Sequence, residues 1–283
     1  MSPKISPKQY EESAAYLRTR LAGAVPQALL ILGSGLGFLA DEMDNIVSVS
    51  YGDIPHFKQS TAPGHKGRLV VGMLAGRCVM VMQGRLHLYE GYSPEEVAYP
   101  VRVAHLLGIN NLLISCACGG VNINYKVGDL ALITDYINFT HKSPLVGFDI
   151  TDFDTRFIDM SHAYDRDFRD LAISIAKEQN ISLQSGVYFY TLGPQFETPA
   201  EIRAIRVLGG DLVGMSAVHE TVMARRLGMR ILGLALVTNM AAGILDTPLT
   251  EEEVLIEGKK ASKMFFGLIK SFVEKMYKHT YKK

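Results

Sequence analysis

A glycine-rich turn follows the first apolar run of the chain and could bind an anion. Residues 33–37 read Gly-Ser-Gly-Leu-Gly directly after the run Ala28–Leu32. Glycines at a strand end allow backbone N–H groups to converge on an anion, and Ser34 can add a hydroxyl donor. The spacing fits neither a dinucleotide-binding fingerprint, because Phe38 replaces its third glycine, nor a nucleophile elbow, because Leu32 replaces its first. The alternative is a tight turn that binds nothing.

A second segment places side chains suited to phosphate close together. The stretch 83–91 follows an apolar run and contains Arg85, His87 and Tyr89. In an extended chain alternate residues share a face, so these three side chains are expected to point the same way. A guanidinium and an imidazole beside a glycine turn are typical of a phosphate site. Taken singly, each residue is more often a solvated or structural side chain.

Other polar residues follow apolar runs further along the chain. Phe196 and Glu197 stand between a predicted strand and a predicted helix, where the ring can stack on a planar ligand and the carboxylate can accept its N–H. By itself Glu197 is also typical of the first turn of a helix, Met215 of a core and Asn239 of a turn. Because ligands of open α/β sheets gather at strand ends, we expect these segments to meet.

Eight predicted strands alternate with segments of helical period and would position these residues. Many are apolar on both faces, as a sheet covered on two sides requires. The strands are expected at Ala28–Leu32, Leu69–Leu74, Cys78–Met82, Leu112–Cys118, Leu130–Tyr136, Gly186–Thr191, Leu212–Met215 and Ile231–Thr238. Helices are expected to begin at the capping motifs of Ser6 and Thr250, and to occupy Pro94–Leu107, Asp165–Gln179, Pro199–Leu208 and Val218–Leu227. This order indicates an α/β fold.

The composition is that of a globular protein and argues against several classes of function. The 283 residues include 29 Lys and Arg against 29 Asp and Glu, and 48% are hydrophobic. Zero net charge gives no electrostatic drive toward nucleic acid or an anionic membrane, and no apolar run approaches the roughly 20 residues of a membrane-spanning helix. The first twelve residues lack the apolar part of a signal peptide, so a cytoplasmic protein is expected. No linker or repeat divides the chain, which predicts one domain over 1–283.

Three cysteines, an odd number, indicate a reducing compartment rather than a disulfide framework. Cys116 and Cys118 lie two residues apart in an apolar run, which places both on one face of a strand. A metal site would need two more ligands nearby, and Cys78 is the only other thiol. We therefore predict small buried side chains and no metal site.

Together these segments resemble the trimeric purine nucleoside phosphorylases over nearly the whole chain. The resemblance rests on residues 32–37, 64–65, 84–91, 119–120, 160–166, 193–198, 213–216 and 238–239, which occur in the family's order. It implies a single-domain, three-layer αβα sandwich around a mixed central β-sheet, assembled as a homotrimer. The implied activity is reversible phosphorolysis of purine ribonucleosides and deoxyribonucleosides in purine salvage, with 6-oxopurines preferred. Inorganic phosphate is then the co-substrate, and no cofactor or metal is needed.

The resemblance also implies a role for each matching residue. The implied phosphate-binding residues are Ser34, His65, Arg85, His87, Ser216 and the backbone around Ala117. The implied ribose-binding and purine-binding residues are Tyr89, Phe196, Glu197, Val213, Met215 and Asn239, with Phe157 reaching the sugar pocket of a neighbouring subunit. Among all of these, His87, Glu197 and Asn239 are the implied catalytic residues.

The sequence departs from the family pattern at three places. Cys116-Ala117-Cys118 stands where the family usually has Asn-Ala-Ala, and Met240 stands where relatives carry lysine. Glu251 aligns with a histidine that often touches the ribose 5′-hydroxyl, so its carboxylate is expected to accept a hydrogen bond there. The alternative for Glu251 is a solvated acid in the first turn of a helix.

Two other functions compete with this interpretation. A purine-binding module without turnover would need the purine contacts but neither Arg85 nor His87. A methylthioadenosine phosphorylase would favour aspartate in place of Asn239. The choice among inosine, guanosine and xanthosine, and between ribose and deoxyribose, stays open at this point.

Overall fold

The computed structural model describes residues 5–147 and 155–277, apart from the side chains of Asn45 and Ile46. In this part of the chain, nine strands form one mixed sheet in the order β2-β3-β4-β1-β5-β8-β7-β6-β9. The strand β5 also pairs with β9, so that β5, β8, β7, β6 and β9 close into a ring. The strands are β1 (Leu29–Leu32), β2 (Asp44–Ser50), β3 (Arg68–Leu74), β4 (Arg77–Gln83), β5 (Asn111–Gly120), β6 (Leu130–Asn138), β7 (Leu183–Tyr190), β8 (Leu212–Gly214) and β9 (Arg230–Met240).

Six α-helices and three short 3₁₀ helices accompany the described strands. They are α1 (Pro7–Arg20), α2 (Pro94–Leu106), α3 (Arg166–Glu178), α4 (Pro199–Val207), α5 (Val218–Arg226), α6 (Glu251–Lys275), η1 (Gly37–Asp41), η2 (Tyr51–Asp53) and η3 (Leu88–Glu90). The capping box predicted at Ser6 is present, and Ser6 N–H donates to Gln9 Oε1 at 2.8 Å. At Thr250 only half of the predicted box is found, where Thr250 Oγ1 accepts from Glu253 N–H at 3.3 Å. Each contact pairs a backbone N–H at the start of a helix, where the helix itself offers no acceptor.

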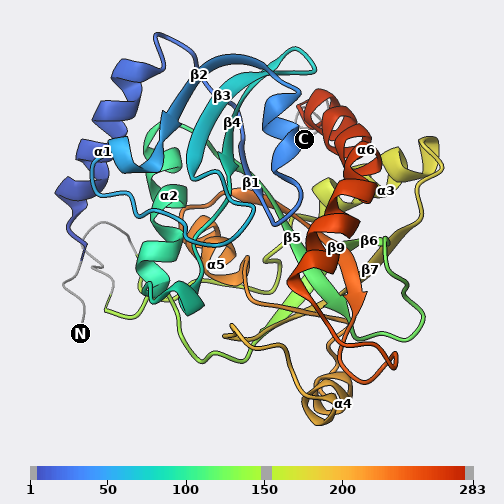
Figure 1. The fold of residues 1–283 in the computed structure, drawn as a ribbon. Coiled ribbons are helices and arrows are strands. Elements are labelled where there is room, and N and C mark those ends of the chain that lie inside the picture. Colours follow the sequence, from blue (N-terminus) through green and yellow to red (C-terminus); the bar gives the residue numbers. More distant parts are fainter. Residues whose placement is uncertain (1–4, 148–154, 278–283) are drawn as a thin grey trace.

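The sheet is covered on both faces, because successive residues of a strand point to opposite sides. In β1, Leu29 and Ile31 join an apolar cluster with residues of α1, α2 and α5. Leu30 and Leu32 join a second cluster with residues of α3 and α6. Figure 1 shows α1 and α2 on one side of the molecule and α3 and α6 on the other. The three-layer αβα sandwich around a mixed sheet is therefore confirmed.

All eight predicted strands are present with shifted ends, but β2 was missed. It pairs only with β3, at the edge of the sheet. Its apolar residues are isolated: Val49 is buried and Val47 half-buried, whereas Ser48 and Ser50 are exposed. An edge strand with one buried face shows a weak alternating pattern rather than a continuous apolar run. None of the helices in the described ranges has the length and hydropathy that crossing a membrane would demand.

Candidate active site

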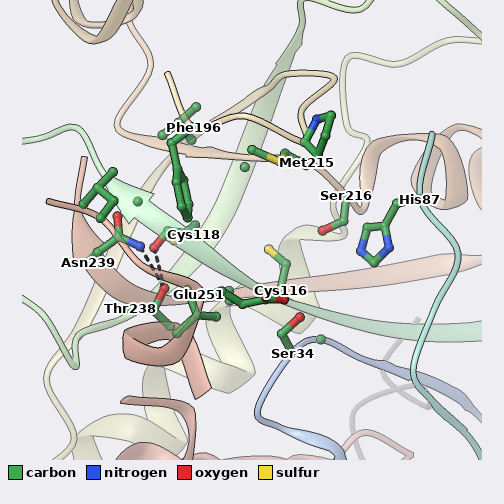
Figure 2. A pocket seen from close by; sticks show the side chains of 18 of the residues that line it. Ser34, His87, Cys116, Cys118, Phe196, Met215, Ser216, Thr238, Asn239 and Glu251 are labelled. Atoms are coloured by element: carbon green, nitrogen blue, oxygen red, sulfur yellow. Dashed lines mark hydrogen bonds between the residues drawn. The ribbon is translucent and has the colours of Figure 1, made fainter. Parts of the chain in front are cut away.

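A cavity of about 480 Å³ lies where the segments after several strands meet. The strands β4, β1, β5 and β9 pair in parallel with one another, so their carboxyl ends meet at the same edge of the sheet. The predicted site residues that line the cavity are Ser34, Arg85, His87, Tyr89, Ala117, Phe196, Glu197, Val213, Met215, Ser216, Asn239 and Glu251. Figure 2 shows Phe196 and Asn239 toward one end of this cavity, and Ser34, Ser216 and His87 toward the other.

The start of α6 forms part of the wall because it packs against the glycine-rich turn. Gly35 has φ +75°, and a Cβ atom there would lie 2.9 Å from the Cα of Gly258. Only glycine permits both this left-handed conformation and this close approach. The contact brings Glu251, Val254 and Leu255 to the cavity, more than 200 residues along the chain from the turn.

Arg85 offers unpaired donors in the interior of the protein. Its side chain is 1% exposed, and its Nη2 donates to Ile31 O at 3.3 Å. Its Nε lies 3.5 Å from Oε1 of Glu220, which is also buried. Neither Nε nor Nη1 has a hydrogen-bond partner among the described residues. A buried guanidinium with unsatisfied donors is suited to bind an anion in the cavity.

His87 is oriented by Glu90 next to this guanidinium. Its Nδ1 lies 2.9 Å from Glu90 Oε1, and its backbone N–H donates to the same oxygen at 2.8 Å. Burial holds the pKa of His87 below its usual range, although the carboxylate opposes this shift. Burial alone would raise the pKa of Glu90, but hydrogen bonds from His87 and Thr61 hold it at about 2. In the neutral tautomer that donates from Nδ1 to this carboxylate, Nε2 is left as an acceptor.

His65 lies behind the cavity wall rather than in it. Its Nε2 is 3.4 Å from Ser34 Oγ, and its ring stacks on His87 with a centroid distance of 5.3 Å. Gly84 allows this position, because a Cβ atom there would lie 2.6 Å from the Cβ of His65. Burial and the nearby His87 lower the pKa of His65 to about 4. In the described structure His65 therefore supports the wall residues Ser34 and His87 and does not itself line the cavity.

Tyr89 lines the cavity, but not in the extended conformation that the sequence predicted. The prediction of one extended segment from Arg85 to Tyr89 was wrong, because Tyr89 lies in the 3₁₀ helix η3. This turn still brings the ring onto His87, with stacked centroids 4.6 Å apart. Burial, followed by the charges of Glu90 and Glu251, raises the pKa of Tyr89 to about 12. The phenol is therefore a neutral hydrogen-bonding group at physiological pH.

The opposite end of the cavity combines an aromatic ring with a carboxylate and an amide. Phe196 is 38% exposed. Thr191 Oγ1 donates to Glu197 Oε1 at 2.7 Å, and Asn239 Nδ2 lies 3.3 Å from Thr238 Oγ1. This end can stack on a planar ring and offer both a hydrogen-bond acceptor and a donor to its polar edge.

Comparison with known proteins identifies the family. The family model of the phosphorylase superfamily matches residues 27–274. Purine nucleoside phosphorylase 1 of Bacillus subtilis is 50% identical over 263 residues, which cover 93% of this chain and 97% of the relative. The chain belongs to the purine nucleoside phosphorylases. It is therefore an enzyme of the glycosyltransferase type.

Other relatives of the enzyme agree with this assignment. Purine nucleoside phosphorylase of Mus musculus is 42% identical, with 97% of each chain covered. A crystal structure of the Schistosoma mansoni phosphorylase in complex with inosine has a TM-score of 0.90 at 38% identity, covering 97% of this chain and 99% of that one. A structure of the same relative with adenosine also has a TM-score of 0.90, at 39% identity and 96% and 98% coverage.

Phe157 is a predicted site residue that does not contact the cavity of its own chain. It is 83% exposed and does not line the cavity. It follows the irregular segment Lys142–Arg156, of which residues 148–154 lie outside the described residues. Contact with a neighbouring subunit stays a prediction, because one chain of the enzyme does not test it.

Cys116 and Cys118 are buried on one face of β5, as the sequence predicted, and both also line the cavity. Burial raises the pKa of the Cys116 thiol to about 11 and that of Cys118 well above its usual range. Cys118 Sγ donates to Leu236 O at 3.3 Å. The two side chains therefore present neutral thiols in the wall of the enzyme's pocket (Figure 2). Among residues 5–147 and 155–277, no cluster of His, Cys, Asp or Glu is arranged to hold a metal ion.

The sequence analysis missed two kinds of site residue. The first is the apolar wall, made of Pro63, Leu249, Val254 and Leu255, which no sequence motif distinguishes from core. The second consists of Thr191 and Glu220, which contact Glu197 and Arg85 from behind. Their contacts become visible only once the chain is folded. The one available hint was Glu220 itself, because an acidic residue is unusual in a mostly buried helix such as α5.

Proposed function

We propose that the enzyme catalyses reversible phosphorolysis of purine ribonucleosides and deoxyribonucleosides, with 6-oxopurines preferred, giving the free base and ribose or deoxyribose 1-phosphate. The observation that carries this proposal is the division of one cavity into two ends. One end holds the buried Arg85, whose Nε and Nη1 lack hydrogen-bond partners among the described residues, together with His87 and Ser34. The other end holds Phe196, Glu197 and Asn239. A nucleoside and a phosphate would fit with the ribose between them.

The chemistry requires charge stabilisation at both ends. Glycosidic cleavage passes through an oxocarbenium-like sugar, with positive charge at the anomeric carbon and negative charge on the departing base. As the C–N bond breaks and its electrons leave with the base, a phosphate dianion bound by Arg85, His87 and Ser34 would stabilise the cation. A phosphate oxygen then forms the new C–O bond, and the departing base takes up a proton. Phosphate itself is the nucleophile, so the reaction uses no protein nucleophile.

The preference for 6-oxopurines follows from the groups at the base end. Glu197 can accept from the ring N1–H that a 6-oxopurine carries, and Asn239 can donate to its N7 and 6-oxo region. A 6-aminopurine has no N1–H and presents a donor at position 6. Buried polar groups left unpaired by the wrong base generate strong discrimination. The Schistosoma mansoni relative was solved with inosine and with adenosine, and a schistosoma phosphorylase was solved with hypoxanthine, which supports a purine in this cavity.

We also propose a homotrimer in which Phe157 closes the sugar region of a neighbouring subunit. The phenyl group of Phe157, which is exposed and does not line the cavity of its own chain, supports this assembly. The sequence of 1–283 would then act as one domain per subunit.

The decisive experiment is base release from a nucleoside panel with and without inorganic phosphate. Inosine, guanosine, xanthosine, adenosine and their 2′-deoxy forms would be compared at equal concentrations. We expect release of hypoxanthine and guanine only with phosphate, and adenine release well below both. Equal release without phosphate would contradict phosphorolysis, whereas equal use of adenosine and inosine would contradict the base preference alone.

A further inference from the structure

Thr191 contacts the carboxylate of Glu197 from outside the cavity. Thr191 directly follows β7, and its side chain is half-buried. Its Oγ1 donates to Glu197 Oε1 at 2.7 Å and lies 3.4 Å from Gly214 O. A hydroxyl has one hydrogen to donate, and the shorter contact to a charged acceptor is the stronger one. The hydrogen therefore belongs to the bond with Glu197.

The backbone fixes where this hydroxyl stands. Thr191 N–H donates to Gly214 O at 2.9 Å, which ties the end of β7 to β8. Gly214 lies between Val213 and Met215, and all three line the cavity. The hydroxyl is thus held by the same strand pair that forms the wall beside the base. One oxygen of Glu197 is occupied by Thr191, which leaves the other for a ligand.

We propose that Thr191 is a positioning residue that sets the preference of the enzyme for purines bearing an N1–H. This inference rests on the proposed function and specifies how its base preference arises. The hydroxyl donor holds Glu197 in one orientation, with the second carboxylate oxygen free to accept from a ligand. A 6-oxopurine meets that carboxylate with a donor, whereas the N1 of a 6-aminopurine meets it with a lone pair. Without the hydroxyl, the carboxylate can rotate away from this orientation, and the disadvantage of 6-aminopurines relative to 6-oxopurines decreases.

The test compares two substitutions at this position with a matched control. Thr191→Val has nearly the same shape but no hydroxyl, and Thr191→Ser keeps the hydroxyl with less bulk. Thr134→Val removes a half-buried hydroxyl that donates to Gly186 O at 3.1 Å, away from the cavity. For each protein, kcat and KM are measured for inosine, adenosine and phosphate.

For Thr191→Val we expect kcat/KM for inosine to fall about tenfold, the usual effect of losing one hydrogen bond to a charged group. The ratio of adenosine to inosine turnover should rise about fivefold or more, with KM for phosphate within about twofold of the wild type. Thr191→Ser and Thr134→Val should resemble the wild type in all three measurements.

Three results would overturn the inference. One is an unchanged adenosine to inosine ratio in Thr191→Val, and another is a serine variant that behaves like the valine variant. The third is an equal loss for phosphate and for inosine, since that pattern indicates general distortion of the cavity. Failure of the proposed function is recognised separately, because the wild-type enzyme would then show no phosphate-dependent release from either nucleoside.

Discussion

Arg85 and Glu220 form an ion pair in the interior of the enzyme, and the pair couples phosphate binding to stability. Their side chains are 1% and 3% exposed, and neither oxygen of Glu220 has a hydrogen-bond partner among the described residues. Removing one member of such a pair leaves a buried charge without compensation, which usually costs about 3–5 kcal/mol. The guanidinium is thus needed in the folded protein whether or not phosphate is bound.

We therefore expect Arg85→Met to lower the free energy of unfolding by about 3–5 kcal/mol, measured by urea denaturation. In the double variant Arg85→Met/Glu220→Gln, the second change removes the unpaired charge and should restore about 2 kcal/mol or more. Both proteins should lose phosphate-dependent activity. Strictly additive effects of the two substitutions would show that the charges do not interact.

At the residue scale, the sequence predicted the side chains that face the ligand better than those that support them. Ser34 and Arg85 follow β1 and β4, and Asn239 lies near the end of β9; because these strand ends meet at one edge of the sheet, their convergence could be predicted. Thr191 and Glu220 act through contacts between elements that are distant in sequence or across a turn. No local pattern encodes such contacts.

At the scale of elements, continuous apolar strands and capped helices were predictable, and their irregular neighbours were not. The 3₁₀ helix η3 follows β4 after a short loop and turns Tyr89 onto His87, where an extended chain had been expected. Runs of three residues carry too little periodicity to distinguish a 3₁₀ turn from an extended segment. Tyr89 nevertheless lines the cavity, because the 3₁₀ turn places its ring beside His87.

The first turn of α6 brings Glu251 to the cavity, near enough to Tyr89 for its charge to raise the pKa of that phenol. If this carboxylate accepts from the ribose 5′-hydroxyl, a 5′-deoxy nucleoside loses the contact, and its kcat/KM should be about fivefold to tenfold lower than that of the parent nucleoside. Glu251→Ala should abolish this difference.

The matched control is Glu252→Ala, which removes the next acid of the same turn; Glu252 is exposed and does not line the cavity. It should retain the discrimination of the wild type. If Glu251→Ala discriminates between the two nucleosides as strongly as the wild type, then Glu251 only favours the helix dipole.

At the scale of the whole molecule, buried neutral histidines should make the enzyme sensitive to acid. His219 is fully buried, packs edge-on against Tyr190 with ring centroids 5.1 Å apart, and has no hydrogen-bond partner for either ring nitrogen among the described residues. Burial, with a smaller effect of Lys142, lowers the pKa of His219 to about 4. Between about pH 6.5 and 4 the unfolded chain binds this proton and the folded one does not, so stability falls as the pH falls.

We expect this histidine to contribute about 2.5 kcal/mol to the stability lost between pH 7 and pH 4.5. His219→Leu should therefore lose less stability over that interval than the wild type in urea unfolding at a fixed protein concentration. An equal loss in both proteins would assign the acid sensitivity to other groups, such as His65, whose pKa burial also lowers to about 4.

The proposed trimer can be tested by substituting the exposed Phe157. Its phenyl group is 83% exposed in the single chain, and burying such a group against a neighbour would stabilise an interface by about 1.5–3 kcal/mol. If the ring closes the sugar region of the next subunit, part of that energy is realised only when a nucleoside is bound. Phe157→Ala should then raise KM for inosine about tenfold while kcat and KM for phosphate change little, the pattern expected when uniform substrate binding is lost.

Val25→Ala, at a valine that is 71% exposed between α1 and β1, serves as the control and should leave KM unchanged. Light scattering that finds a fully active monomer, or an unchanged KM for Phe157→Ala, would contradict a shared site, because each subunit would then complete its own.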